Sequence, residues 1–233
     1  MKSQTRQPSI NHSRWYRHLQ YFANRLHMGY PFNTVKKKIT GAGNHTTYQK
    51  SILSSVSFDI QGNQNRILIK KNCFLNNVRF YIRGDNHTII ISEQCCFSRG
   101  GDIWFEDRDC SLTIAEQSTF EDVHIAVTEP GSSVSIGKNC MFAYDIDVRT
   151  GDSHSIISSV DGKRINYAQD IAIGDHVWVA AHCSLLKGVS VSDNSIVATG
   201  SVVTKPFQEG NVIIAGNPAR IVTKNVTWLR ERV

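Results

Sequence analysis

The feature that most constrains this chain is an apolar residue at every sixth position across residues 171–205. These positions are Ile173, Val179, Leu185, Val191, Val197 and Val203. A strand repeats every two residues and a helix every 3.6, so neither element alone produces a period of six. Three short strands separated by turns do produce it if they wind into coils of about 18 residues that stack on one another. The spacing therefore predicts a parallel stacked coil.

Four upstream segments repeat the same pattern at a longer interval. They are ILIKKNCFL from Ile67, IIISEQCCF from Ile89, LTIAEQSTF from Leu112 and VSIGKNCMF from Val134. In each, a small residue lies four positions after an apolar one, and Leu or Phe follows two positions later. The small positions predict a corner column where a bulky side chain would force the coils apart. Cys73, Cys95, Cys140 and Cys183 occupy such positions. Because no CxxC pair is present, we expect buried packing cysteines rather than disulfides or zinc ligands.

Composition narrows the class of protein. The 233 residues are 40% hydrophobic and 20% charged, enough to bury the core of one domain with small appendages. No run of 18 apolar residues is present, and the N-terminal sequence lacks the apolar core of a signal peptide. We therefore expect a cytoplasmic protein.

Basic residues concentrate in residues 1–38, which contain eight Lys and Arg and no acidic residue, whereas the remainder holds 18 basic and 20 acidic residues. Within this segment Trp15, Leu19, Phe22 and Leu26 form the apolar stripe of an amphipathic helix. One interpretation is a helix that caps the end of the fold. The alternatives are contact with an anionic polymer or peripheral association with an anionic membrane. Nucleic acid is disfavoured because no binding motif accompanies the charge.

Four motifs carry a family resemblance: IGDHVW, LLKGV, ATGSVVTK and IAGNPARIV. They resemble the hexapeptide-repeat acyltransferases, strongly over residues 134–223 and more loosely over the earlier coils. The resemblance implies an all-β fold, a left-handed parallel β-helix, over residues 39–222. It also implies a homotrimer with acetyl-coenzyme A in the groove between neighbouring subunits. We expect a short helical segment before this domain, within residues 1–38, and a C-terminal tail helix over residues 223–233.

One loop, residues 149–170, interrupts the hexads, and long loops between rigid coils often carry function. Acyl transfer to a hydroxyl needs a base, and histidine serves well near neutral pH. In the acetyltransferases that this sequence resembles, the base is a loop histidine 24 residues before a tryptophan of the next coil; His154 and Trp178 match that pair. The tryptophan would lie near the thioester. Asp145, Asp147 and Asp152 are alternative carboxylates to orient His154.

The resemblance also assigns cofactor contacts. It implies that Ala181 and Thr199 face the pantetheine arm, Thr204 and Lys205 the far end of the cofactor, and Arg220 the phosphates. Ala180 replaces a family glycine, which would narrow the pantetheine channel. His176 and His182 lie six residues apart and therefore project from adjacent faces of the coil, so we expect no metal site.

The loop sequence from DSHSI to GKRIN resembles the branch that O-acetylates bacterial capsular polysaccharides, including the polysialic acid O-acetyltransferases. Lys163, Arg164 and the basic N-terminal segment suit an anionic glycan. The first hypothesis is direct acetyl transfer from acetyl-CoA to a polysaccharide hydroxyl activated by His154. The alternatives are a small acceptor, such as a free sugar, an antibiotic or a sugar nucleotide, and a catalytically silent β-helix that serves as a scaffold.

Overall fold

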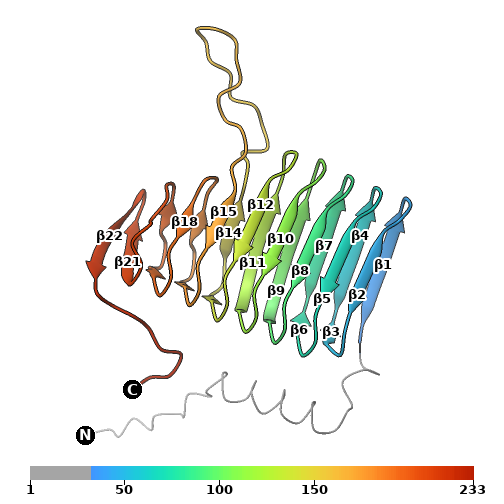
Figure 1. Ribbon diagram of the computed structural model, residues 1–233, viewed down its shortest axis with the longest axis horizontal. Helices are drawn as coiled ribbons and strands as arrows, with labels where there is room; N and C mark the ends of the chain where they lie inside the picture. The colour runs from blue at the N-terminus through green and yellow to red at the C-terminus, as the bar shows by residue number, and fades with distance from the viewer. Residues whose placement is uncertain (1–32) are drawn as a thin grey trace, which may run out of the picture.

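The computed structural model describes residues 33–233, so the predicted stripe from Trp15 to Leu26 lies outside the described residues. The chain winds into stacked coils and forms one elongated solenoid (Figure 1). Apart from one antiparallel hairpin at the C-terminal end, the paired strands are parallel. No helix occurs within residues 33–233. The predicted all-β parallel solenoid is confirmed.

The first side of the solenoid is a seven-stranded sheet. Its strands are β2 (His45–Tyr48), β5 (Arg66–Ile69), β8 (Thr88–Ile91), β10 (Ser111–Ile114), β12 (Ser133–Ile136), β15 (Ile171–Ile173) and β18 (Ser190–Val191). The inward residues predicted from the repeats pair in unbroken register from coil to coil: Ile69, Ile91, Ile114, Ile136, Ile173 and Val191. The hexad spacing therefore gave the stacking order correctly.

The second side contains β3 (Ile52–Ser54), β6 (Phe74–Asn76), β13 (Met141–Phe142), β16 (Trp178–Val179), β19 (Ile196–Val197) and β21 (Val212–Gly216). The third side contains β1 (Val35–Thr40), β4 (Val56–Gln61), β7 (Val78–Arg83), β14 (Ile146–Arg149), β17 (Ser184–Leu185) and β20 (Val202–Val203). Two long strands, β9 (Cys96–Phe105) and β11 (Thr119–Val127), run continuously from the second side into the third. They join both sides into one fifteen-stranded sheet, and β22 (Ala219–Lys224) closes it against β21.

A column of phenylalanines fills part of the interior. Phe120 stacks between Phe97 and Phe142, with ring centroids 4.4 and 4.9 Å away, and all three rings are buried. Full burial of such a side chain stabilises the fold by about 1.5–3 kcal/mol relative to exposure. The solenoid is therefore held together by apolar contacts between coils.

The corner between the first and second sides, here called the first corner, explains two features of the repeat. The thiols of Cys73, Cys95 and Cys140 donate to carbonyl oxygens of the next coil at 3.0–3.1 Å, so they pack as small buried residues as predicted. One residue per coil adopts a positive φ there: Lys50, Asn72, Gln94, Gln117, Asn139, His176, Asn194 and Asn211. Asn and His tolerate this conformation better than most residues, so a turn requirement accounts for His176.

Two predicted boundaries differ from the structure. Strand β1 begins at Val35, so the solenoid starts inside the segment assigned to the N-terminal helix. The predicted C-terminal tail helix is wrong, because β22 extends to Lys224 and residues 225–233 contain no helix. Trp228 and Arg230 instead contact successive coils, which requires an extended chain, and a nine-residue helix has little stability by itself.

Candidate functional site

His154 lies in an arm, residues 150–170, that projects from the solenoid between β14 and β15 (Figure 1). The arm leaves at the third corner, between the third and first sides. An antiparallel bridge between Ile157 and Arg164 pairs its two halves. His154 is exposed, and its backbone N–H donates to the Asp152 carbonyl at 2.7 Å. His154 therefore lies on a turn close to where the arm leaves the solenoid, a region here called the foot of the arm.

Asn166 ties the foot of the arm together and is only 5% exposed. Its side-chain amide donates to the His154 carbonyl at 2.7 Å and to the Asp152 carboxylate at 2.8 Å. Its Oδ1 accepts the backbone N–H of Ile156 at 2.7 Å and the Arg164 Nε at 3.2 Å. The backbone that carries His154 is thus fixed by one buried side chain.

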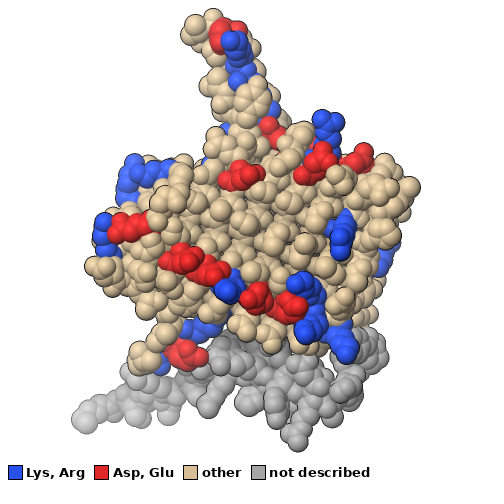
Figure 2. All heavy atoms as spheres, viewed as in Figure 1, with Lys and Arg blue, Asp and Glu red and all other residues tan. Residues whose placement is uncertain are grey.

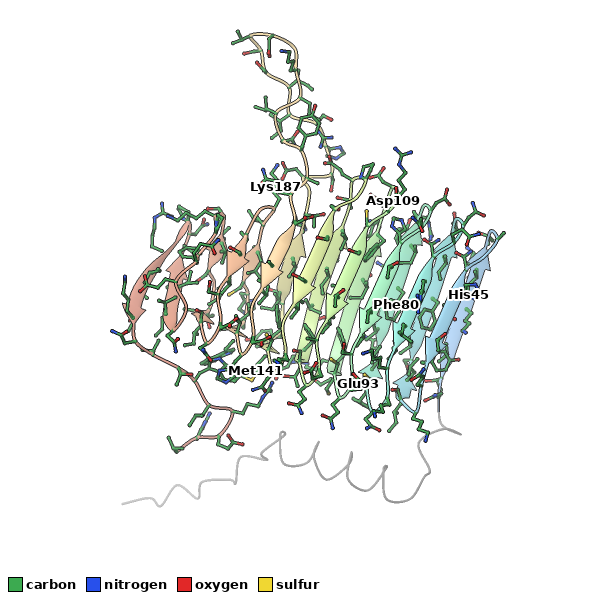
Figure 3. All side chains as sticks on the ribbon, in the orientation of Figure 1. His45, Phe80, Glu93, Asp109, Met141 and Lys187 are labelled. Atoms are coloured by element: carbon green, nitrogen blue, oxygen red, sulfur yellow. The ribbon has the colours of Figure 1, made fainter. Side chains whose placement is uncertain are left out.

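Lys187 anchors the same foot to the following coil. It forms an ion pair with Asp152, and its ammonium donates to the Asn166 carbonyl at 3.3 Å. The hydrogen bond from Lys187 lowers the pKa of Asp152 below its ordinary value. Figure 3 shows Lys187 beneath the arm. Asp152 therefore acts as a structural anchor.

None of the three predicted carboxylates contacts the His154 ring. Asp145 accepts from His182 Nδ1 at 2.6 Å. Asp147 bonds His124 at 2.8 Å and Arg149 at 2.7 Å. Burial alone would raise the pKa of Asp147, but these two partners bring it below its ordinary value. Within residues 33–233 the imidazole of His154 has no carboxylate partner.

Trp178 lies on a different part of the coil. It begins β16 on the second side, where it faces outward, half-buried, in register with Met141. Figure 3 places Met141 and Lys187 on opposite edges of the solenoid, so Trp178 and the foot of the arm are separated within one chain. The structure does not bring His154 and Trp178 together in a single copy.

The predicted cofactor residues occupy two corners and the last strand. Ala181 and Thr199 lie on successive coils at the second corner, between the second and third sides, where the Gly200 N–H donates to the Ala181 carbonyl at 2.9 Å. Thr204 and Lys205 are exposed at the third corner of the coil that contains Thr199, and Arg220 is exposed on β22. Trp178, Ala181 and Thr199 therefore lie on the second side or at its end, whereas His154 lies at the third corner. Ala180, the replacement for a family glycine, is 7% exposed.

Charge in the arm is largely compensated. Arg164 pairs with Glu129, and Lys163 lies 3.5 Å from Asp161 at the arm tip. Figure 2 shows both signs at the tip and across the visible face. Arg164 therefore helps to hold the arm to the solenoid through Glu129. Of the two basic residues predicted to suit an anionic glycan, Lys163 is the exposed one.

Sequence reasoning missed the roles of Asn166, Lys187 and Glu129, because partners such as Ile156, Asp152 and Arg164 lie 10–35 residues away and no local pattern pairs them. His176 and His182 lie at different corners and bind Asn194 and Asp145. Across residues 33–233 no cluster of three or more His, Cys, Asp or Glu side chains is arranged to hold a metal ion. In the same range no helix is long and apolar enough to cross a membrane.

No family model matches this sequence. The polysialic acid O-acetyltransferase of Neisseria meningitidis is 35% identical over 123 residues, which are 53% of this chain and 57% of that protein. The chain thus matches little more than half the length of this curated relative. Two solved structures match a larger share of this chain. They are the polysialic acid O-acetyltransferase OatWY, at TM-score 0.76, and the polySia specific acetyltransferase NeuO, at TM-score 0.74. Each is 30% identical over 86% of this chain, and the match covers 93% and 90% of the respective structures.

A parallel hexapeptide solenoid interrupted by one histidine-bearing arm, with these structural matches, is typical of the hexapeptide-repeat acetyltransferases. Within that class, the chain belongs to the family of polysialic acid O-acetyltransferases.

Proposed function

We propose that this protein is an acetyl-CoA-dependent O-acetyltransferase that acetylates a hydroxyl of an anionic capsular polysaccharide containing sialic acid. The observation that carries the proposal is the exposed His154 on a fixed arm, in a solenoid that matches two polysialic acid acetyltransferases over 86% of its length. The proposal includes the left hand of the coil and a cytoplasmic location, where acetyl-CoA is supplied.

A complete site needs more than one copy of the chain. His154 stands at the third corner, whereas Trp178 and Ala181 lie on the second side and at the second corner. A ring-shaped assembly in which one surface meets a different surface of the next copy can bring such separated residues together. A homotrimer with His154 of one subunit beside Trp178 of the next therefore accounts for both positions.

His154 acts as the general base in this site. One imidazole nitrogen accepts the proton of the acceptor hydroxyl as its oxygen attacks the thioester carbonyl. The new C–O bond replaces the C–S bond, and the proton passes from the imidazolium to the departing thiolate. The hydrogen bonds that Asn166 makes to the arm foot fix the base without a carboxylate partner.

Acetyl-CoA would supply an activated thioester, and the residues that the family resemblance assigns to this cofactor suit its chemistry. Ala181 is small and half-buried and Thr199 is exposed, so the pantetheine arm can approach the second corner. Lys205 and Arg220 are exposed cations, and neither forms an ion pair with a carboxylate within residues 33–233. Phosphate groups are bound well by such cations. These residues hold the cofactor in the proposal, with no metal required.

The acceptor is proposed from the family, and the three basic residues Lys36 to Lys38, with the basic segment that precedes them, suit an anionic polymer. The experiment is release of free thiol from acetyl-CoA by purified protein, with polysialic acid, neutral polysaccharides and small sugars as acceptors. His154→Ala serves as the test variant and His45→Ala as its control, because His45 is exposed on β2, far from the arm (Figure 3).

Release with polysialic acid that is lost only in His154→Ala supports the proposal. Release with small sugars alone overturns the polymer acceptor, and no release with any acceptor overturns the activity.

A further inference from the structure

We propose that Trp228, fixed in place by Arg230, positions the Trp178 indole for acetyl transfer. The C-terminal segment, residues 225–233, then contributes to the active site through Trp228. This inference rests on the proposed function, because it assigns a role beside Trp178.

Trp228 is buried on the outside of the solenoid, at 5% exposure. Its ring stacks on His176 at a centroid distance of 4.3 Å and an interplanar angle of 11°. Its Nε1–H donates to the His176 carbonyl at 2.8 Å. The same ring lies 6.2 Å from that of Trp178, tilted by 50°. Trp228 therefore has one defined orientation and forms one wall beside the Trp178 indole.

Arg230 fastens the segment two residues further on. Its guanidinium donates to Thr119 Oγ1 and to the Cys140 carbonyl, both at 2.9 Å, and to Asn139 Oδ1 at 3.2 Å. These partners belong to the two coils that precede the coil of Trp178. The planar fork of arginine loses little freedom when it makes several such bonds. The segment is thus fixed across three coils, with Trp228 held over the third.

Trp178 needs such a neighbour. It lies on the two-residue strand β16, and its side chain faces outward between its register partners Met141 and Ile196. Those partners pack beside the indole along the sheet, whereas Trp228 approaches it from the first corner. A displacement of about 1 Å in a group that aligns the reacting atoms can slow an enzyme about 10²-fold. Loss of Trp228 frees the Trp178 ring to move by that amount.

A purely structural role for residues 225–233 predicts a different result. If residues 225–233 only cover the first corner, changes at Trp228 lower the melting temperature and leave the folded enzyme with normal kinetics. If Trp228 positions Trp178, kcat falls in protein that is fully folded. The KM for acetyl-CoA then changes less than kcat.

The experiment compares Trp228→Ala and Trp228→Phe with Leu229→Ala as a matched control. Leu229 is the next residue and is 60% exposed. Steady-state kinetics are measured at a temperature where circular dichroism shows every variant to be folded. In parallel, the protein is labelled with 5-fluorotryptophan, and the fluorine resonance of Trp178 is assigned by its loss in Trp178→Phe. Trp104, on β9 and stacked on Tyr81, is the internal reference.

We expect Trp228→Ala to lower kcat about tenfold or more, within the range for a misplaced catalytic group. Trp228→Phe keeps a stacking ring but loses the N–H donor, so its kcat lies between those of Trp228→Ala and wild type. The Trp178 resonance shifts in both variants, while that of Trp104 stays in place. Leu229→Ala behaves as wild type.

A folded Trp228→Ala enzyme with wild-type kcat overturns the inference, whatever its fluorine spectrum. An active wild type with unaffected Trp228 variants leaves the proposed function standing. An inactive wild type with every acceptor overturns the proposed function, and the positioning role falls with it.

Discussion

Lys187 forms an ion pair with Asp152 and so joins the foot of the arm to the coil that follows it. The arm is therefore bound to the rigid solenoid close to His154. Asn166 completes the junction, since it donates to Asp152 and accepts from the Ile156 N–H. The position of the proposed base depends on these buried and half-buried contacts.

The Lys187→Met substitution removes the ammonium, so Arg164–Glu129 is the ion pair that still joins the arm to the solenoid. We expect turnover to fall about tenfold, because a loosened arm holds His154 in the reactive geometry less often. Limited proteolysis should cleave within residues 155–165 faster than in wild type. Lys71→Met is the control, since Lys71 is an exposed lysine at the first corner, away from the arm. Equal turnover in Lys187→Met and wild type would show that the ion pair does not position the base.

The lowered pKa of Asp152 predicts how the arm responds to acid. A carboxyl group with a folded-state pKa below its unfolded value stabilises the structure above the unfolded value, and this contribution is lost as pH falls through the folded pKa. The ordinary value is 3.8, so the junction should weaken below that pH. Amide exchange of Ile156, corrected for intrinsic rate, should lose protection there. Asp152→Asn should show no such change, and an identical change in both proteins would contradict the assignment.

The phenylalanine column predicts a large stability effect. Phe120→Ala removes the ring between Phe97 and Phe142, and such a substitution typically costs about 3–5 kcal/mol of unfolding free energy. Tyr144→Ala, at a ring that is 41% exposed, should change it by about 0.5 kcal/mol or less. Chemical denaturation monitored by circular dichroism measures both. Similar losses in the two variants would argue against the column as a main source of stability.

The stacking of the solenoid could be predicted from the sequence because each coil repeats the same requirements. Ile136 and Ile173 are register partners although the arm lies between them, and both belonged to the predicted inward column. The repeats also marked the arm, since the hexads stop at its start. A period in the sequence is therefore direct information about which residues lie above one another.

The details of the site could not be predicted in the same way. Asn166 and Lys187 act through contacts distant in sequence, and no local pattern specifies which carboxylate each one binds. Asp152 was a candidate partner of His154 because it is nearby in sequence, yet its carboxylate is taken by Lys187 and Asn166. The prediction of a C-terminal helix was wrong because tertiary contacts of Trp228 and Arg230 determine the conformation of that segment.

The catalytic roles of His154 and Trp178 stay predictions, and their separation in one chain provides the sharpest test. His154→Ala and Trp178→Ala chains, each with a different affinity tag, are produced together, and assemblies that carry both tags are isolated. Thiol release from acetyl-CoA with polysialic acid is then compared with each variant alone.

If neighbouring copies share each site, every trimer that carries both tags has one interface of three that pairs an intact His154 with an intact Trp178, so about a third of the wild-type activity per site should be restored. His154→Ala alone lacks the base, so its turnover should fall about 10²-fold or more. Trp178→Ala alone should also have reduced turnover. Mixed assemblies no more active than the separate variants would contradict a site shared between subunits.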